Sequence, residues 1–364
     1  MKQSPEKHLR IAIAGAGSIA QRSHIPALLR LPRVQVAAIQ SRGLDKARRL
    51  AKMVRKDAGP ETEPHIYDDF EEMLVRERPD AVGIFAPNYL HAAFTIKALN
   101  AGSHVLVEKP MATTVADARA MLEAAERADR VLMVAMQRRY SIWVRAIKQA
   151  IDDDVIGTPH FLRARLAHGG PRFTAPGQTW FFEKEKSGGG AMIDLGVHVA
   201  DLARWLLGEV QAVIGKIAVL GPPSEVEDNG AMILHFQSGA IGVSEASWTT
   251  QPRQWVVEVY GSKGTAIIGH AGAEVAIQRG DGVTAPGYSV DEIVRKFQDN
   301  DEAVTPMDAL VATFFEAIRG RADPVPSGID GMKAVELIEA CYRSARSGTE
   351  VALPLRDPKR HGES

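Results

Sequence analysis

The sequence has few of the features that mark several large classes of protein. It has one cysteine among 364 residues, Cys341, which excludes an intrachain disulfide and a cysteine-ligated zinc or iron–sulfur site. Its formal net charge of -1 gives no basic field that would attract nucleic acid or an anionic membrane. No stretch approaches the roughly 20 apolar residues that cross a bilayer, and the polar N-terminal segment lacks the apolar core of a signal peptide. We therefore expect a soluble cytoplasmic protein with no nucleic-acid or membrane partner.

The length and the order of the apolar segments predict two domains. A chain of 364 residues is too long for one ordinary core. Over residues 1–140, strand-like runs alternate with helical patterns, which is typical of a parallel, doubly wound α/β sheet. Over residues 141–364, strand-like runs follow one another without room for crossover helices, which predicts an α+β domain with a large, mostly antiparallel open sheet. The closing helices of this second domain can pack back onto the first.

A glycine turn follows the first apolar strand in the segment "IAIAGAGSIA". Gly15 permits a tight turn, Gly17 lets the backbone approach a pyrophosphate, and Ala20 keeps the next helix close to the sheet. The N-terminus of that helix receives the negative charge, so Ser18 and Ile19 belong to the same predicted cofactor site. The alternative is a glycine-rich turn without a ligand, but the position between a strand and a helix favours a dinucleotide.

The end of the second predicted strand indicates which nicotinamide cofactor is used. An Asp or Glu at this place would bind the ribose hydroxyls of NAD. The sequence has Ser41 and Arg42 there, and the first acidic residue is Asp45. A hydroxyl and a guanidinium suit a 2′-phosphate better than a bare diol, so NADP is favoured over NAD. The alternatives are that Arg42 is a solvated surface charge or that it stacks on the adenine.

Three polar residues interrupt an apolar helical pattern in "SGGGAMIDLGVHVADLARWLLG", at 187–208. Spacings of four and three place Asp194, His198 and Asp201 on one face of a helix, where buried polar groups need partners or a cleft. His198 could be a satisfied core histidine bonded to Asp194, a metal ligand with its neighbours, or a catalytic base oriented by Asp194. No other cluster of His, Asp or Glu accompanies it, so no metal is expected.

The segment "VLVEKPMA" contains a second polar group whose burial would cost free energy. This is Lys109, just after a strand that is predicted to be buried. A lysine at this position destabilises the fold unless a partner or a substrate interacts with its charge. The structural alternative is an ion pair with Glu108 or Asp194 that only ties the domains together. Two such polar groups in one chain favour a shared site in which His198 is the base.

These motifs, in this order, make the chain similar to the Gfo/Idh/MocA oxidoreductases. The resemblance covers nearly the whole chain and rests on "AGAGSIA", "APNYLHAAFTIKALNAGSHVLVEKPMA" and "SGGGAMIDLGVHVADLARWLLG". The "EKP" and "DLGVH" signatures together are much more specific than the glycine turn. The resemblance implies a Rossmann domain over 1–140 and a substrate-binding and oligomerisation domain over 141–364. It also implies a homodimer or homotetramer formed through the second domain's sheet.

The resemblance assigns the catalytic roles as well. It implies that Lys109, Asp194 and His198 are catalytic and contact the substrate, that Lys109 also contacts the cofactor, and that the Lys109–Pro110 peptide is cis. The charge of Lys109 would favour a developing alkoxide, and His198 would take the hydroxyl proton. Asp194 would orient His198 or bind a neighbouring hydroxyl. The hydride would pass to the nicotinamide ring.

Softer matches to the family extend both sites. The further residues that the resemblance places at the cofactor are Pro87, Asn88, His91, Glu108 and Arg138. Those that it places at the substrate are Arg139, His168, Arg172 and Trp180. Arg172 could receive a phosphate or carboxylate. A solvated surface charge is the alternative for each of these arginines, and Trp180 could simply pack.

The resemblance implies an NAD(P)-dependent enzyme that moves hydride to or from a hydroxyl or keto carbon of a sugar, nucleotide sugar or inositol-like polyol. Two other functions stay open. One is a glycosidase-like enzyme with a closed redox cycle, which oxidises a ring hydroxyl, eliminates the glycosidic bond, holds NAD tightly and shows no net cofactor turnover. The other is a non-catalytic NAD(P)-binding regulator, which the intact catalytic set argues against. Neither the particular substrate nor the direction of the reaction follows from the sequence.

Overall fold

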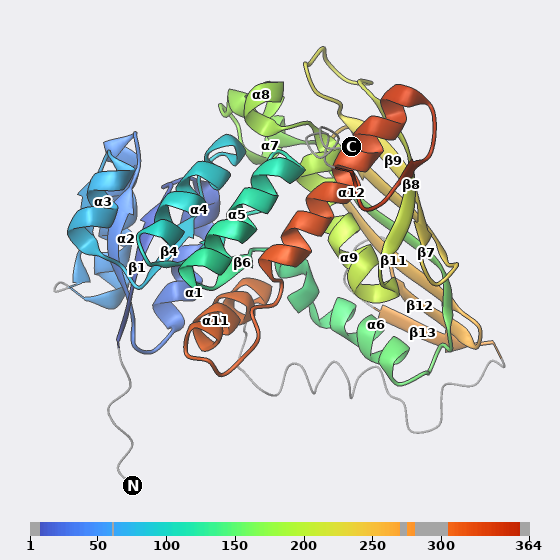
Figure 1. The fold of residues 1–364 in the computed structure, drawn as a ribbon, viewed down its shortest axis with the longest axis horizontal. Coiled ribbons are helices and arrows are strands. Elements are labelled where there is room, and N and C mark those ends of the chain that lie inside the picture. The colour runs from blue at the N-terminus through green and yellow to red at the C-terminus, as the bar shows by residue number, and fades with distance from the viewer. Residues whose placement is uncertain (1–7, 60–61, 270–274, 281–304, 357–364) are drawn as a thin grey trace, which may run out of the picture. The chain divides into compact units, whose positions relative to one another are not determined.

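The computed structural model describes residues 8–59, 62–269, 275–280 and 305–356 (Figure 1). Its described residues fall into two compact units. Unit 1 comprises Met1–Gln137 and Val304–Met332, and unit 2 comprises Arg138–Ala303 and Lys333–Ser364. The long C-terminal helix α12, Gly328–Ser347, begins in unit 1 and continues in unit 2.

Unit 1 is a doubly wound α/β structure. Its elements in chain order are β1 Leu9–Ala14, η1 Ala20–His24, α1 Ile25–Arg30, β2 Val34–Gln40, α2 Leu44–Ala58, β3 His65–Tyr67, α3 Phe70–Glu77, β4 Ala81–Ile84, η3 Asn88–Leu90, α4 His91–Asn100, β5 His104–Val107, α5 Val115–Ala128, β6 Leu132–Val134 and α11 Pro306–Ile318. The predicted helix after the glycine turn consists of the π turn η1 followed directly by α1, and Pro26 lies in the first turn of α1, where its missing N–H costs no intrahelical hydrogen bond. Strand β3 and helix α3 were not predicted from the sequence.

The six strands of unit 1 are parallel and lie in the order β3-β2-β1-β4-β5-β6. Buried aliphatic side chains such as Ile11, Ile39 and Ile84 fill the space between the sheet and its helices. Helices α4 and α5 pack side by side, and α11 packs on α1 (Figure 1). The strand order reverses between β1 and β4, and in sheets of this kind ligands bind at the carboxyl ends of the strands beside that reversal.

Unit 2 is built around a larger sheet. Its elements, apart from the end of α12, are η4 Gln137–Tyr140 at the junction, α6 Ile142–Asp152, β7 Pro159–Ala167, α7 Pro171–Thr174, η5 Thr179–Phe182, α8 Lys184–Ser187, η6 Met192–Gly196, α9 Val197–Leu207, β8 Val210–Ala218, β9 Asn229–Phe236, β10 Ile241–Ser247, β11 Gln254–Gly261, β12 Gly264–Ile268, β13 Val275–Arg279 and β14 Val351–Ala352. The strand order is β13-β12-β11-β7-β10-β9-β8-β14, and the pair β7–β10 is parallel while the other pairs are antiparallel.

One face of this sheet is covered by helices. Helix α9 and the π turn η6 pack on β7 and β10, and α6 packs on β12 and β13. Alternate strand residues such as Leu162, Leu234 and Val259 point into this core and are buried. On the opposite face Ile233 and Ile241 are 39% and 43% exposed, so this face has an apolar component open to solvent. The predicted α/β fold with a parallel and a mostly antiparallel sheet is confirmed.

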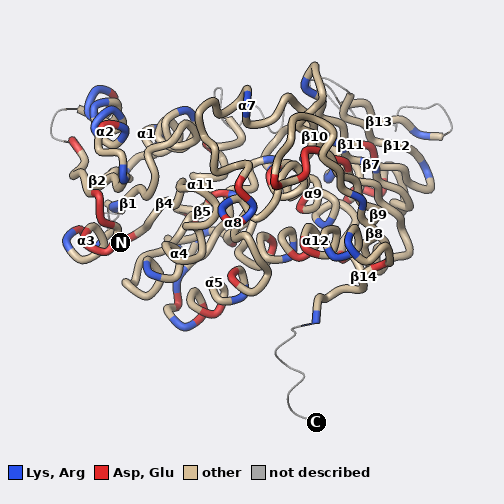
Figure 2. The backbone as a smooth tube through the Cα atoms, turned by 90° about the horizontal axis from the view of Figure 1, so that it is seen from above, with Lys and Arg blue, Asp and Glu red and all other residues tan. Residues whose placement is uncertain are grey.

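Charged residues of both signs lie on the outer helices of unit 1, although basic positions prevail on α2 (Figure 2). Figure 2 shows both acidic and basic positions along α5, for example. The mixture on α5 is typical of a solvated helix face. None of the helices formed by the described residues is both long enough and apolar enough to traverse a bilayer.

Candidate active site

The glycine turn of unit 1 has the geometry that a dinucleotide needs. Gly15 has φ +104°, and a Cβ there would lie 2.5 Å from the Phe85 carbonyl oxygen, so only glycine fits. A Cβ at Gly17 would meet nothing within 4 Å, so the backbone at Gly17 faces open space. Ala20 is fully buried, which lets η1 approach the sheet closely. These three observations fit a pyrophosphate resting on the turn and the helix N-terminus.

The other residues predicted for the cofactor in unit 1 lie at the carboxyl ends of the neighbouring strands. Ser41 and Arg42 follow β2, Pro87 and Asn88 follow β4, and Lys109 follows β5. Since β2 and β4 flank β1, β5 lies beside β4 and all these pairs are parallel, the carboxyl ends lie at the same edge of the sheet as the glycine turn. The topology therefore gathers residues that are far apart in the sequence at one edge.

Arg42 lies just after β2, at the position where an acidic residue would bind the ribose hydroxyls of NAD. Arg42 is exposed and donates from Nη2 to the Tyr89 hydroxyl at 2.9 Å. Gln40, the last residue of the strand, is buried and donates to the carbonyl of Asp68. Tyr89 was not predicted from the sequence, because its approach to Arg42 depends on the loop after β4.

His91, which was predicted to lie at the cofactor, contacts two backbone carbonyl oxygens. Its ring is buried, with Nδ1 2.7 Å from the Pro110 carbonyl oxygen and Nε2 2.8 Å from that of Ala86. Burial lowers the pKa of His91. Both ring nitrogens therefore face backbone oxygens, so the structure gives His91 the work of tying the loop after β4 to the loop after β5.

Glu108 and His24 form a buried pair beneath Lys109. His24 Nε2 lies 2.7 Å from Glu108 Oε1, and Glu108 Oε2 accepts the Lys109 backbone N–H at 3.0 Å. The His24 ring also stacks on Phe85 at 3.6 Å between centroids. Burial by itself would raise the pKa of Glu108, but the hydrogen bond from His24 and the charges of His24 and Lys109 outweigh it and lower the pKa.

This pair links the glycine-turn helix to the lysine loop. His24 is the last residue of η1, so Glu108 is the connection between the turn at the end of β1 and the backbone of Lys109. The Lys109–Pro110 peptide is cis, as the resemblance implied. Nothing in the sequence pattern marked His24, since a single histidine on a short helix has no distinguishing spacing.

In unit 2, a run of glycines lets a buried carboxylate hold the start of the helix that carries Asp194 and His198. Glu227 accepts the N–H groups of Gly190 and Met192, each at 3.0 Å, and the Tyr342 hydroxyl at 2.8 Å. A Cβ at Gly190 would lie 1.7 Å from the Glu227 carbonyl oxygen, so a side chain there is excluded. Burial raises the pKa of Glu227. A carboxylate at a helix N-terminus stabilises the helix end.

Asp194 and His198 lie on two different kinds of helix. Asp194 is in the π turn η6 and is half-buried, and its Oδ2 accepts the Trp248 indole N–H at 3.1 Å. His198 is buried in the first turn of α9. The single helix predicted within residues 187–208 is thus a π turn followed by an α-helix, a departure often found at functional sites. Trp248 was not predicted as a partner of Asp194.

The two arginines at the start of unit 2 make contacts within that unit. Arg139 is buried and donates twice to Asp201, at 2.9 Å from Nε and 2.5 Å from Nη2. Its guanidinium is thereby used in a bidentate ion pair with the same helix that carries His198, so its geometry is that of a structural residue. Arg138 lies over the Trp255 ring at 4.3 Å, and burial with nearby Arg253 lowers the pKa of Arg138 to about 10.

The remaining residues predicted for the substrate lie on the loop that follows β7. His168 Nδ1 accepts the Gly170 N–H at 2.8 Å, which shapes the start of this loop. Arg172 is exposed and its guanidinium lies 4.7 Å over the Phe182 ring. Trp180 stacks on Phe181 and donates to Gln178, so it packs within the loop. In the described part of the chain, no three His, Cys, Asp or Glu side chains are grouped as metal ligands.

Two regions of the chain match models of known protein families. Residues 9–136 match the model described as "Oxidoreductase family, NAD-binding Rossmann fold", and residues 144–267 match the GFO/IDH/MocA C-terminal domain. The chain belongs to the Gfo/Idh/MocA oxidoreductase family. The two matched regions follow one another in the order that the motifs had implied.

Other members of the Gfo/Idh/MocA family are similar over most of their length. The 1,5-anhydro-D-fructose reductase of Ensifer adhaerens is 31% identical over 86% of this chain and 92% of its own. The D-glucoside 3-dehydrogenase of Escherichia coli K12 is 27% identical over 97% of this chain and 99% of its own. Among solved structures, the WlbA dehydrogenase of Chromobacterium violaceum in complex with NADH and UDP-GlcNAcA has a TM-score of 0.84 at 27% identity, covering 98% of this chain and 100% of that one.

Proposed function

We propose that this Gfo/Idh/MocA protein transfers hydride between a nicotinamide cofactor and a hydroxyl-bearing or keto carbon of a carbohydrate. The observation that carries the proposal is the pair of polar residues, Asp194 and His198, on a mostly apolar helical segment whose start is bound by the buried Glu227. Family membership supports it, since the similar proteins named above are sugar dehydrogenases and reductases. We assign cofactor binding to a domain of residues 1–140 and substrate binding to residues 141–364.

The proposed reaction uses three side chains of this chain. Lys109 is held by its backbone at the end of β5, and its positive charge stabilises the oxygen as it becomes an alkoxide. His198 takes the hydroxyl proton during oxidation and returns it during reduction. Asp194, fixed by the indole of Trp248, orients the substrate or the imidazole. When bound, the nicotinamide supplies the hydride acceptor or donor.

We propose further that the cofactor is NADP. The support is the guanidinium of Arg42 beside Tyr89 at the end of β2, where a carboxylate would favour NAD. NADH is bound in the similar WlbA structure, so NAD is the competing cofactor for this chain. Gln40 and Ser41 offer no negative charge that would repel a 2′-phosphate.

Arg42→Ala should separate the two cofactors. Loss of a charge-assisted contact to the 2′-phosphate should raise KM for NADP about tenfold or more and change KM for NAD less than twofold. The measurement is steady-state kinetics with both cofactors. Arg48→Ala on α2 is a matched control, because Arg48 is exposed and pairs with Asp45. An equal change for both cofactors would show that Arg42 does not contact a phosphate.

A panel assay tests the proposed function directly. Purified protein is mixed with NADP or NAD and with sugars, inositols, glycosides and nucleotide sugars, and absorbance of the reduced nicotinamide is followed. A rise with one class establishes net dehydrogenation and names the substrate class. No rise with any class, together with NAD released only on denaturation, would instead favour a closed redox cycle on a glycoside. A non-catalytic regulator would bind cofactor reversibly and change neither cofactor nor substrate.

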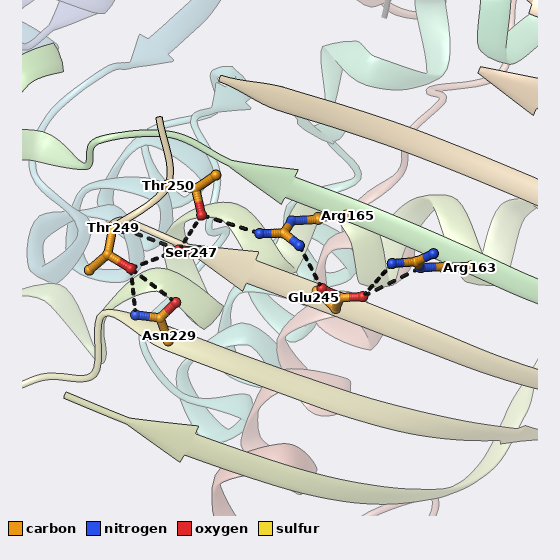
Figure 3. A network of polar contacts seen from close by, with 7 residues as sticks. All are labelled: Arg163, Arg165, Asn229, Glu245, Ser247, Thr249 and Thr250. Carbon is orange, nitrogen blue, oxygen red and sulfur yellow. Dashed lines mark hydrogen bonds and ion pairs between the residues drawn. The ribbon is translucent and has the colours of Figure 1, made fainter. Parts of the chain in front are cut away.

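We propose that the chain forms a homodimer or homotetramer through the open face of the large sheet. On this face Val243 of β10 lies opposite Ile233 of β9, and Ile233 lies opposite Ile214 of β8. The polar part of the same face is a hydrogen-bonded network across β7, β10 and β9 (Figure 3). Its members are Arg163, Arg165, Asn229, Glu245, Ser247, Thr249 and Thr250. Both arginines of the network bind Glu245 within the same chain, so the network satisfies much of its own hydrogen-bonding capacity before a second copy covers the face.

Ile233→Arg should weaken that association. A charge placed in the centre of a symmetric interface is introduced twice and has no partner, so the Kd for assembly should rise at least about tenfold. Sedimentation velocity across a range of protein concentrations measures it. Val75→Arg on α3 is the control, since Val75 is 70% exposed in unit 1. A wild-type protein that is monomeric at all concentrations would overturn the proposal.

A further inference from the structure

A cavity of about 380 Å³ lies within unit 2 and is lined in part by Trp248, the hydrogen-bond partner of Asp194. It is lined by the segment after β7, the segment between β8 and β9, and the two residues that follow β10. Its size is within the range of small-molecule sites and suits one ring with its substituents. No residue of this cavity apart from Arg172 was predicted for a ligand.

Two aromatic side chains give the cavity its shape. Trp248 and Phe182 both line it, and their rings meet edge to face at 5.9 Å between centroids. Phe173, which is 72% exposed, adds a third aromatic ring to the lining. Aromatic faces bind the apolar faces of rings, and an exposed aromatic beside a cavity gains from being covered.

Trp248 joins this cavity to the proposed catalytic helix. Its indole N–H donates to Asp194 Oδ2 at 3.1 Å, so a ligand resting against the indole is separated from that carboxylate by one side chain. The backbone N–H of Trp248 donates to the Asp228 carbonyl at 2.7 Å, which fixes the position of the ring. A molecule that reached both Asp194 and the cavity would therefore span two adjoining groups.

The charges in the cavity balance. Among the lining residues that the structure describes, Arg172 is the cation and Asp228 is the anion. Asp228 is itself used, since its oxygens accept the N–H groups of Leu220 at 2.8 Å and Gly221 at 2.7 Å. Burial would raise the pKa of Asp228, but these backbone donors and Asn229 outweigh it and lower the pKa, so the carboxylate is ionised near pH 7. A diphosphate in this space would face a fixed negative charge with one arginine to offset it, which disfavours a nucleotide.

We propose that this cavity binds the uncharged second ring of a glycoside whose reacting sugar lies at Asp194. This inference rests on the proposed function and specifies its substrate class. It departs from the expectation that Arg172 receives an anion, because Asp228 lines the same space. The aromatic lining and the balanced charge favour a neutral ring, and the contact between Trp248 and Asp194 places that ring next to the reacting sugar.

Matched pairs of glycosides test the cavity in the full-length protein. Dissociation constants are measured by ligand-observed NMR titration for the methyl and phenyl β-glycosides of D-glucose, D-galactose and D-mannose. The two members of each pair differ only in the group that would enter the cavity. Stacking and burial of the phenyl ring should make the phenyl glycoside of at least one sugar bind about tenfold tighter.

Two variants and one control assign any preference to the cavity. Phe182→Ala removes one aromatic side chain of the lining, and Ser224→Trp fills the space from the opposite loop; neither side chain is in the proposed catalytic set. Both should bring the phenyl and methyl affinities to within about twofold of each other. Phe181→Ala is the control, since Phe181 is on the same short helix η5, stacks on Trp180 and does not line the cavity.

The outcomes test ligand binding in the cavity independently of the proposed hydride transfer. The inference is supported if the phenyl glycoside binds more tightly, if both variants abolish this preference and if Phe181→Ala retains it. This holds even if none of the glycosides reduces the cofactor, a result that would contradict the proposed function alone. Equal affinity within every pair, or no detectable binding of any glycoside, would overturn the inference. Tighter binding of UDP-glucose than of every glycoside, reduced by Arg172→Ala, would also overturn it in favour of a nucleotide.

Discussion

Lys109→Met is expected to lower kcat about 10³-fold, because it removes a positive charge from the position where negative charge develops on the substrate oxygen. Methionine keeps much of the length and the apolar stem of lysine. The backbone of residue 109 is held through its N–H by Glu108, and this contact survives the substitution. KM for the cofactor should therefore change little, and the loss should fall on kcat.

The comparison for Lys109→Met is another lysine of unit 1. Lys97 on α4 is exposed and pairs with Glu71, so Lys97→Met removes only a surface ion pair, which contributes about 0–1 kcal/mol to stability. Its kcat should stay within twofold of the wild type. A kcat for Lys109→Met within tenfold of the wild type, with the fold intact by thermal unfolding, would remove Lys109 from the proposed mechanism.

His198→Asn is expected to lower kcat/KM about 10³-fold at neutral pH by removing the general base. Asparagine retains a polar group of similar size at a buried position, which limits the effect on folding. The loss should shrink as the pH rises, because hydroxide takes over the removal of the hydroxyl proton. A pH profile of kcat/KM measures both the loss and its slope. His160→Asn on β7 is the control, since His160 is exposed on the same unit.

The double variant Lys109→Met/His198→Asn tests whether the two residues serve one reaction. Groups that act as a unit are strongly non-additive, so the double variant should be at most about tenfold slower than the slower single variant. Losses that multiply to about 10⁶-fold would mean that the two side chains act independently. A flat pH profile for His198→Asn with unchanged kcat/KM would return His198 to the role of a core histidine.

The elements that could be predicted from the sequence are those with a clear local pattern. The alternation of apolar runs with helical spacing predicts β1, β2 and α5 within a few residues of where they lie. Strand β3 has three residues and β13 has five, too few for a period to emerge. The parallel pairing of β7 with β10 was also beyond reach, because it joins residues that are about 80 positions apart.

The residues of the candidate site could be predicted where a polar side chain would cost free energy on burial and also belongs to a recognisable motif. Lys109, Asp194 and His198 met that condition. Their supporting partners did not, because a buried glutamate such as Glu227 or a tryptophan such as Trp248 has no distinctive spacing and is recognised only through its contacts. Arg139 and His91 show the converse, since each has a polar side chain that the fold uses internally. The sequence pattern shows where burying a polar group would cost free energy, and only the fold shows which contacts offset that cost.

The two π turns among the described residues have a consequence for alignment. Each lies close to a buried histidine: His24 ends η1, and His198 is the second residue after η6. A residue added to or removed from a helix rotates everything downstream by about 100°, so one deletion in either turn would carry its histidine to another face without changing any motif letter. The number of residues between Gly15 and His24, and between Gly190 and His198, is therefore as much a part of the site as their identity. In alignments, gaps belong outside both intervals, and a relative with a different count should be treated as having lost the geometry even where both histidines remain.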